Sequence, residues 1–380
     1  MLFSLTDEQQ LLRDSAAAFV RDHSSLKRIR TLRDSQDADG FSRALWKEMA
    51  GLGWLGIPFA EADGGLGLGL KELGLVLEEL GKGLMPEPII ASLLLGGMAI
   101  ARGGSDAQRG ELLPGLIAGD RLLTLAWQEA HSRYDASCVA TRAARAGDGW
   151  RLSGEKRLVA DGHVADQLVV SARTAGGDRE RDGITLFLID RQADGVRVTR
   201  QATLDSRNAA IVRFDGATVA PHAVLGTVDG GAALLEEVLD RAAAGLCAEM
   251  LGGMQAVFAM TLDYLKTRQQ FGVPIGSFQA LKHRAANVFT EIELARSAAL
   301  AAAMALDEAL PQAPQFVSIA KARCSDAFLL AANEGVQMHG GIGMTDEHDV
   351  GFYLKRARAA ELTFGDAAFH RERYAALQGY

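Results

Sequence analysis

The sequence predicts an α+β protein of several domains, in the order helical, β, helical. Helical periodicity dominates to about Gly119, short β-branched and aromatic runs follow from Leu122 to Phe214, and long alanine-rich segments come after Gly230. A chain of 380 residues also exceeds the usual size of one domain. The expected parts are an N-terminal helical domain over residues 1–121, a middle β domain over 122–228 and a C-terminal helical bundle over 229–380.

The N-terminal domain is expected to begin with an amphipathic helix. Thr6 and Gln9 form a capping-box pattern, in which each side chain satisfies a backbone N–H at the start of a helix. Leu12, Ala16 and Phe19 then fall on one helical stripe. Prolines and glycines further along break the rest of the region into several short helices.

The middle domain is expected to form a small antiparallel barrel or sandwich. Its runs are short, rich in β-branched and aromatic residues, and separated by Gly and Asp turns. The runs that predict strands are Leu122–Trp127, Trp150–Ser153, Gln167–Ser171, Ile184–Ile189 and Ala210–Phe214.

The C-terminal domain is expected to be an antiparallel four-helix bundle. Three long segments without internal proline carry this prediction, at about residues 232–267, 278–306 and 314–338. Their length and alanine content favour helices over strands.

Composition narrows the classes of function. A net charge of -8, with no Lys/Arg block, argues against a nucleic-acid partner. Cys138, Cys247 and Cys324 form no C-x-x-C pair, so we expect buried thiols rather than disulfides, and no metal site. The N-terminus lacks a basic leader and no uninterrupted apolar run is long enough for a bilayer, so we expect a cytoplasmic protein with no membrane partner.

Two clusters of residues predict a binding site. The first, from Arg268 to His283, sets a cation, an aromatic side chain, two glycines and several amides between helical segments. The second, from Gln337 to Met344, places three glycines in an otherwise helical pattern. Glycine permits positive φ and lets backbone N–H groups approach an anion, and the arginine fork suits phosphate. We therefore expect the two clusters to hold a large anionic cofactor.

The chain resembles the acyl-CoA dehydrogenase family of flavoproteins. That family carries an Arg-x-x-Phe-Gly segment followed by Gln-x-x-Gly-Gly-x-Gly, matched here at Arg268 and at Gln337. The segments Thr6–Ser15, Leu52–Pro58 and Leu152–Lys156 also look like this family, so the likeness runs nearly end to end.

The resemblance implies an FAD-dependent oxidoreductase that converts an acyl-CoA thioester to trans-2-enoyl-CoA, in fatty acid or steroid catabolism. It also implies a tetramer, with electron-transfer flavoprotein as the electron acceptor. In the family, FAD lies between the β domain and the bundle and its adenine end reaches into a neighbouring subunit. By resemblance, the cofactor-binding residues are Arg268 at the pyrophosphate, Phe271 and Gln279 at the nucleotide or ribityl part, and Gln337, Gly340 and Gly341 at the adenosine end, together with Gln270.

The catalytic base of the family is matched less well. In many members it is the glutamate of a Tyr-Glu-Gly-Thr motif, and an alignment without gaps from Gly340 puts Phe364 at that position. Phenylalanine cannot accept a proton. Asp366, two residues further on, is one candidate for the base.

Other members place the base at the start of the first long bundle helix, beside an arginine. Asp240 and Glu249 are the candidates there, and Arg241 is a candidate substrate contact. The alternative for Asp240 is an acid that is favoured by the helix dipole, and the alternative for Glu249 is a buried or interface acid.

The β domain departs from the family pattern as well. Arg133 and Tyr134 stand where members usually have glycine and serine, and Leu158–Asp161 replaces the Trp-Ile-Thr-Asn segment beside the flavin ring. Two interpretations follow. The chain is a homotetrameric acyl-CoA dehydrogenase, or it is the partner subunit of an α2β2 heterotetramer and completes the FAD site of a second dehydrogenase chain.

Overall fold

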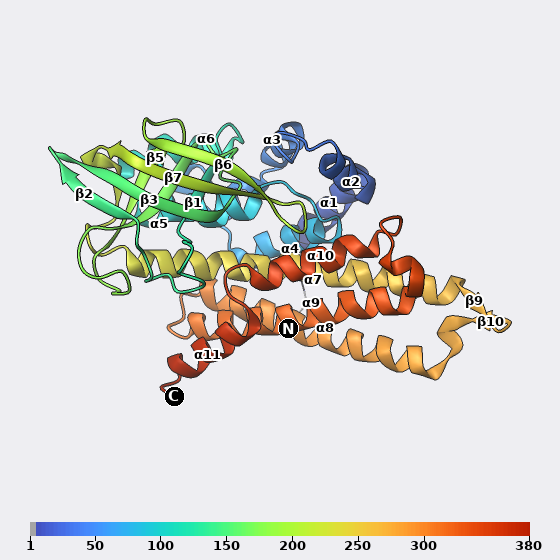
Figure 1. Ribbon diagram of the computed structural model, residues 1–380. Helices are drawn as coiled ribbons and strands as arrows, with labels where there is room; N and C mark the ends of the chain where they lie inside the picture. Colours follow the sequence, from blue (N-terminus) through green and yellow to red (C-terminus); the bar gives the residue numbers. More distant parts are fainter. Residues whose placement is uncertain (1–4) are drawn as a thin grey trace. The chain divides into compact units, whose positions relative to one another are not determined.

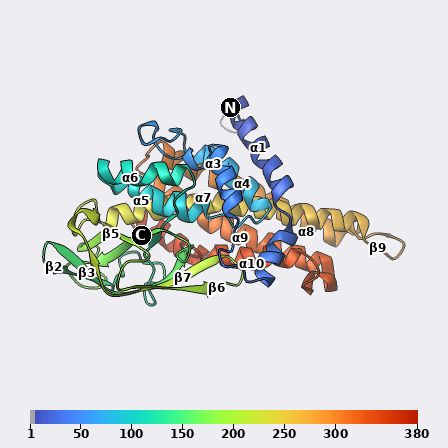
Figure 2. The ribbon, with the colours of Figure 1, turned by 90° about the horizontal axis from the view of Figure 1, so that it is seen from above.

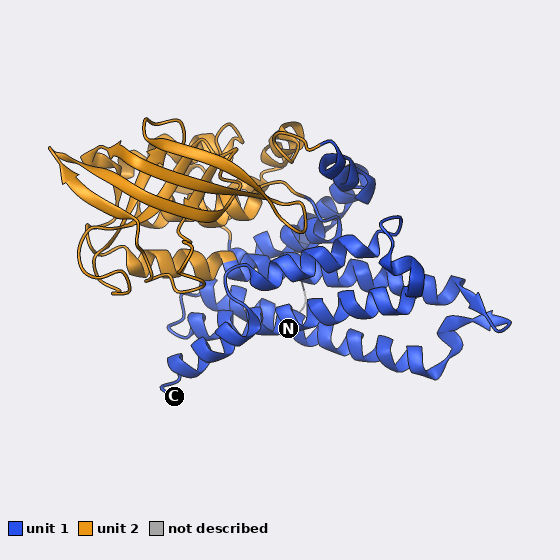
Figure 3. Cartoon of the chain, in the orientation of Figure 1, with its two compact units in different colours: residues 1–35, 69–85, 243–380 blue, residues 36–68, 86–242 orange. Residues whose placement is uncertain are grey.

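The computed structural model describes residues 5–380, which form two compact units (Figures 1 and 3). Unit 1 combines residues up to 35 with 69–85 and 243–380, and unit 2 combines 36–68 with 86–242. Each unit is therefore assembled from separate stretches of the chain. The predicted order of N-terminal helices, middle β domain and C-terminal helical bundle is confirmed.

Unit 1 is helical apart from one small hairpin. Its helices are α1 (Asp7–His23), α2 (Leu26–Asp34), α4 (Leu70–Lys82), the larger part of α7 (Ala232–Thr267), α8 (Gln279–Asp307), α9 (Ala313–His339), α10 (Val350–Leu362) and α11 (Ala367–Leu377), with 3-10 turns η5 (Ile275–Ser277) and η6 (Gly340–Met344).

Local capping explains where the first helices of unit 1 begin. The Thr6 hydroxyl accepts from the Gln9 backbone N–H at 3.2 Å, and the Gln9 amide oxygen accepts from the Thr6 N–H at 3.1 Å. This is the expected capping box. Ser25 caps α2 in the same way, accepting from the Arg28 N–H at 3.2 Å.

A side chain from a distant helix caps α4. The Asp307 carboxylate at the end of α8 accepts from the Leu70 N–H at 2.8 Å and the Lys71 N–H at 3.0 Å. The negative charge also complements the helix dipole at this end. Further along α4, a Cβ on Gly81 would lie 2.1 Å from the carbonyl oxygen of Glu249, so glycine permits the close packing of α4 on α7.

The C-terminal bundle matches the predicted segments within one or two residues. Residues Ala285, Val288, Ile292, Ala295 and Ala299 recur every three or four positions on α8 and are buried. Small side chains on this stripe let the helices pack closely. In both views the hairpin of β9 (Gln269–Gln270) and β10 (Val273–Pro274) projects beyond the ends of α7 and α8 (Figures 1 and 2).

The helix α7 has the length and composition of a membrane span, alone among the helices of residues 5–380. Its most apolar window has a mean hydropathy of 1.3. Within the fold, 67% of that window is buried, which is the pattern of a core helix.

Unit 2 holds a sheet of eight strands in the order β6-β7-β3-β2-β4-β5-β8, with β1 also paired to β4. Its strands are β1 (Leu123–Ala126), β2 (Arg142–Ala146), β3 (Gly149–Ala160), β4 (Gln167–Arg173), β5 (Ile184–Asp190), β6 (Val196–Ala202), β7 (Asn208–Val219) and β8 (Val224–Leu225). Its other elements are α3 (Arg43–Gly51), η1 (Trp54–Gly56), η2 (Glu61–Asp63), the π-helical η3 (Ile90–Gly97), α5 (Met98–Gly103), α6 (Asp106–Ile117) and η4 (Pro221–Ala223).

Buried and exposed residues alternate along parts of the sheet. On β7, Val212, Phe214 and Ala217 are buried while Arg213 and Asp215 are exposed. Most pairings are antiparallel, as predicted, but β1 and β4 pair in parallel over their whole overlap. A run of β-forming residues does not encode strand direction, so the sequence could not distinguish this pairing.

Candidate functional site

The first predicted cluster forms a tight hairpin at the end of α7. Its two-residue turn is Phe271-Gly272, and both residues have positive φ, at 54° and 79°. Two-residue hairpins of the I′ type require positive φ at both positions, which glycine accepts readily. The Ile275 N–H donates to the Arg268 carbonyl at 2.8 Å and closes the base of the hairpin.

The second cluster ends α9, and its three glycines have different physical roles. Gly340 has a φ of 67°, which L side chains rarely adopt. A Cβ on Gly343 would lie 2.8 Å from the Val336 carbonyl oxygen, so Gly343 permits close backbone packing. Gly341 has neither constraint, and a Cβ there would meet no atom within 4 Å. Its missing side chain leaves open space beside the turn.

The two clusters share one pocket within unit 1. Its volume is about 650 Å³, which is within the size range of small-molecule and cofactor sites. The lining residues are Tyr264, Arg268, Gln270, Ile275, Leu281, Gln337, Met338, His339, Gly340, Gly341 and Ile342.

His339 contributes an unused acceptor to this region. The residue is buried, and its Nδ1 lies 2.6 Å from the Gly335 carbonyl oxygen, so Nδ1 carries the hydrogen. The other ring nitrogen, Nε2, is buried and has no hydrogen-bond partner in the described part of the chain. Burial lowers the pKa of His339, so the neutral ring keeps a lone pair on Nε2. A buried unsatisfied acceptor costs about 1–3 kcal/mol, which a ligand donor would offset.

Five of the seven predicted cofactor-binding residues line the pocket, namely Arg268, Gln270, Gln337, Gly340 and Gly341. The other two do not. Phe271 is 90% exposed at the hairpin tip and its ring contacts Phe278 at 6.1 Å, while Gln279 is an exposed residue at the start of α8.

Tyr264 and His339 line the pocket but were not among the predicted cofactor-binding residues. The ring of His339 lies 4.5 Å from that of Tyr264. Tyr264 lies four residues before Arg268, which directly follows α7, and the Arg268 N–H donates to the Tyr264 carbonyl at 2.8 Å. This helical spacing is a signal that could have identified Tyr264.

A second turn, between α10 and α11, carries the position of the missing glutamate. Phe364 and Gly365 both have positive φ, at 60° and 114°. His370 Nε2 donates to the Phe364 carbonyl at 3.0 Å, and Lys321 Nζ donates to the Gly365 carbonyl at 2.8 Å. The turn is therefore fixed from inside by two buried side chains.

Burial lowers the pKa of both side chains that hold this turn, His370 and Lys321. It lowers the pKa of His370 to about 3, so this ring is neutral near pH 7. It lowers the pKa of Lys321 to about 8. Lys321 is fully buried, and its other hydrogen bonds go to the Glu361 carbonyl at 2.9 Å and the Ser325 hydroxyl at 3.1 Å.

The candidate bases occupy different settings. The Asp366 carboxylate accepts from the Phe369 N–H at 2.8 Å and caps α11. Glu249 is buried and pairs with Arg356, with 2.9 Å between Oε1 and Nε. Asp240 is also buried, 7% exposed, in the part of α7 that belongs to unit 2.

Arg241, the candidate substrate contact, has an acidic neighbour in the same helix. Its Nε lies 3.3 Å from the Glu237 carboxylate.

The departures of the β domain lie in a loop around Arg133 and at the end of β3, which contains Leu158. Arg133 has a φ of 48° and its guanidinium lies 5.5 Å from the centre of the Tyr134 ring. Leu158, with a φ of 50°, is 53% exposed. The loop around Arg133 is anchored by Glu129, which pairs with the fully buried Lys156 at 2.6 Å.

Comparisons with known proteins agree along the whole chain. Models for the N-terminal, middle and C-terminal domains of acyl-CoA dehydrogenases match residues 6–120, 124–216 and 229–377. Isovaleryl-CoA dehydrogenase from Pongo abelii is 30% identical over 97% of this chain and 88% of that protein.

Two solved assemblies have closely similar chains. The Tcur3481-Tcur3483 steroid ACAD is 33% identical, with a TM-score of 0.87 over 98% of both chains. The ChsE4-ChsE5 complex from Mycobacterium tuberculosis is 29% identical, with a TM-score of 0.89 over 99% of this chain and 98% of that one. The resemblance seen in the sequence is confirmed: the chain belongs to the acyl-CoA dehydrogenase family of FAD-dependent oxidoreductases.

Proposed function

We propose that this chain takes part in the FAD-dependent α,β-dehydrogenation of an acyl-CoA thioester to a trans-2-enoyl-CoA, and that its pocket in unit 1 holds the dinucleotide end of FAD. The observation that carries the proposal is the pocket of about 650 Å³ lined by both predicted clusters. When bound, the flavin supplies the electron sink that accepts the substrate hydride.

The residues of the pocket fit this cofactor. Arg268 supplies a permanent positive charge for a phosphate group, and the space beside Gly341 admits a ligand close to the backbone. The His339 Nε2 offers an acceptor to a hydroxyl or amino group. Gln337 and Gln270 add amides that can donate and accept.

Glu249, which pairs with Arg356, and Asp366, which caps α11, stay candidates for the base of a self-sufficient enzyme. We favour Asp240, because the family pattern sets an acid beside an arginine in this helix and Asp240 directly precedes Arg241. Asp240 is buried, 7% exposed. In this role its carboxylate would take the α-proton of the thioester as the hydride leaves from the β-carbon.

A second candidate function, the partner subunit of a heterotetramer, is favoured by the replacement at Phe364. The side chain at the usual position of the base cannot accept a proton, and the surrounding turn is closed by Lys321 and His370. The relatives that form two-chain complexes, one of them acting on steroids, support this assembly. In it, this chain would complete an FAD site whose base belongs to the other chain.

The visible spectrum of the purified chain separates the two candidates. A chain that carries flavin bands, and whose bands bleach when butyryl-CoA or a steroid-derived acyl-CoA is added without oxygen, works as an enzyme by itself. A colourless chain that gains FAD and activity only after co-expression with a second dehydrogenase chain is a partner subunit. A chain that binds no FAD in either preparation would exclude both.

The remaining expectations belong to the same proposal. Electron-transfer flavoprotein is the proposed electron acceptor, and either a homotetramer or an α2β2 heterotetramer is the proposed assembly. A reducing cytoplasm is supported by the free, buried thiols of Cys138, Cys247 and Cys324.

A further inference from the structure

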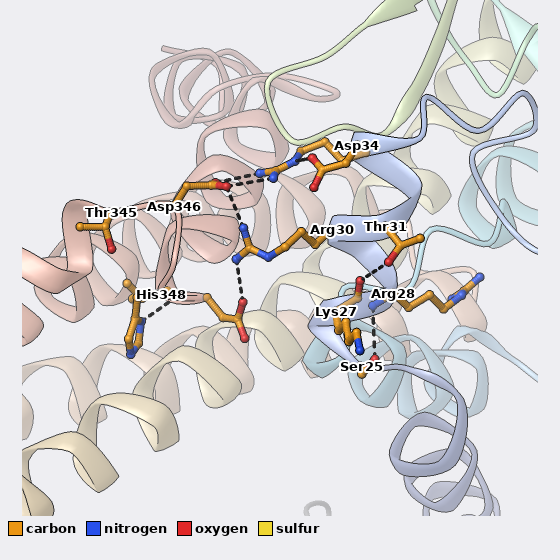
Figure 4. A network of polar contacts seen from close by, with 12 residues as sticks. Ser25, Lys27, Arg28, Arg30, Thr31, Asp34, Thr345, Asp346 and His348 are labelled. Atoms are coloured by element: carbon orange, nitrogen blue, oxygen red, sulfur yellow. Dashed lines mark hydrogen bonds and ion pairs between the residues drawn. The ribbon is translucent and has the colours of Figure 1, made fainter.

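The loop that follows the glycine turn is held by the second helix of the chain. The helix α2 carries Arg30 and Arg33, which lie three residues apart and so project from one face. Both reach the loop between η6 and α10, more than 300 residues away in sequence. Figure 4 shows this cluster, with His348 on the same loop.

The contacts have the geometry of a fixed network. Arg33 binds the Asp346 carboxylate through two parallel hydrogen bonds of 2.8 and 2.9 Å, and Arg30 binds the same carboxylate at 2.7 Å. Arg30 also donates to Asp349 at 3.1 Å. The hydrogen bonds from Arg33 hold the pKa of Asp346 at about 2. An isolated surface ion pair contributes little, but a bidentate pair within a network fixes position.

An aromatic ring completes the attachment. The guanidinium groups of Arg30 and Arg33 lie 4.8 and 5.3 Å from the centre of the Phe352 ring in the first turn of α10. The side chains of both arginines are only 24% exposed. The loop is thus held at Asp346, at Asp349 and at the helix that follows.

The held loop contacts one of the residues that line the pocket. His348 lies between Asp346 and Asp349 in sequence, and its ring is 4.4 Å from that of His339. The Val350 N–H donates to His348 Nδ1 at 3.2 Å and so orients the imidazole. His339 in turn lines the pocket with Gly340. A continuous set of contacts therefore runs from α2 to the proposed dinucleotide site.

We propose that Arg30 and Arg33 are positioning residues for this site, because they hold the loop that presses His348 against His339. The inference rests on the proposed function of the pocket. A loop released from α2 would have to be ordered each time FAD binds, and that ordering would reduce the affinity.

The test compares Asp346→Asn with Asp326→Asn, measuring the affinity for FAD by quenching of flavin fluorescence and the exchange of backbone amides over residues 339–349. Asp326 pairs with Arg371 and lines no part of the pocket, so it is the matched control. We expect Asp346→Asn to weaken FAD binding about threefold to tenfold, to speed exchange in the loop and to leave Tm nearly unchanged. Asp346→Glu should recover part of the affinity, and the charge-swapped pair Arg33→Asp with Asp346→Arg should recover more than either single change.

The outcomes separate the inference from the function on which it rests. If the unmodified chain, alone or with its partner chain, binds no FAD, the proposed function fails. In that case, unchanged amide exchange in Asp346→Asn would still refute the attachment of the loop to α2. If the unmodified chain binds FAD and Asp346→Asn binds it equally well, Arg30 and Arg33 do not position the site.

Discussion

Two turns in unit 1 each follow a helix and contain a residue with positive φ, but they differ in their hydrogen bonds. One follows α9 at Gly340 and the other follows α10 at Phe364, and each has a buried neutral histidine beside it. At the first, His339 Nε2 has no hydrogen-bond partner in the described part of the chain, and a Cβ on Gly341 would meet no atom within 4 Å. At the second, His370 and Lys321 donate to the turn's own carbonyls.

This difference indicates which of the two turns is suited to bind a ligand. A turn that lies beside an unsatisfied acceptor, and whose glycines leave space next to the backbone, is suited to receive a ligand, because the ligand supplies the missing contacts. A turn whose carbonyls are already satisfied holds itself in place and needs no ligand. This contrast supports the proposal that the first turn binds a dinucleotide, whereas the Phe364 side chain cannot act as a base.

The largest expected effect tests where the base lies. If this chain is self-sufficient, Asp240→Asn should lower the rate of flavin bleaching by acyl-CoA at least about a hundredfold while FAD remains bound. Asp366→Asn is the matched control, because asparagine caps a helix as well as aspartate and should leave the rate unchanged. An unchanged rate in Asp240→Asn would remove it as the base and would favour a base on another chain.

The next prediction tests whether Arg268, which lines the pocket together with the glycine turn, contacts the cofactor. Arg268→Met should weaken FAD binding about tenfold to a hundredfold, because a hydrogen bond to a charged group contributes roughly 1.5–3 kcal/mol. Lys266→Met removes a cation two residues earlier that lines no part of the pocket and is 72% exposed. Equal affinities of the two variants, measured by fluorescence quenching, would mean that Arg268 does not contact the cofactor.

Two glycine substitutions test whether one glycine of the turn leaves space for a ligand and another permits close backbone packing. Gly341→Ala should keep the stability of the protein but weaken FAD binding severalfold, because its Cβ meets no protein atom. Gly343→Ala should lower the free energy of unfolding by about 1–3 kcal/mol, because its Cβ would lie 2.8 Å from the Val336 carbonyl oxygen. Urea unfolding and FAD titration of both variants check the difference, and a loss of stability in Gly341→Ala would mean that the space is not reserved for a ligand.

Local signals in the sequence were sufficient for much of this structure. The capping box at Thr6 and the three long bundle helices lie where local patterns placed them, and five of the seven residues proposed to bind the cofactor line one pocket. The strand β2 escaped prediction because its Arg-Ala-Ala-Arg-Ala sequence has no β-branched residue. Phe271, which is proposed to contact the nucleotide, has positive φ and lies at the exposed tip of the hairpin.

Contacts between distant segments were not predictable in the same way. Arg30 and Asp346 are 316 residues apart, and no local pattern pairs them. The unused Nε2 of His339 also depends on three-dimensional packing, since the same residue with a second partner would have no acceptor to offer. Sequence patterns thus pointed to the segments that are proposed to bind the cofactor, and the structure was needed to show which contacts hold these segments in place.

The last prediction tests how the turn at Phe364 is supported. Burial lowers the pKa of Lys321 from 10.5 to about 8, so between these two values the unfolded chain holds a proton that the folded chain has released. The free energy of unfolding should therefore rise with pH in this window, relative to Lys321→Met, by up to about 1.4 kcal/mol per pH unit. Urea unfolding of both proteins at pH 7 and pH 10 measures the difference. A constant difference would mean that Lys321 titrates alike in both states, and the turn at Phe364 would then not rest on a buried cation.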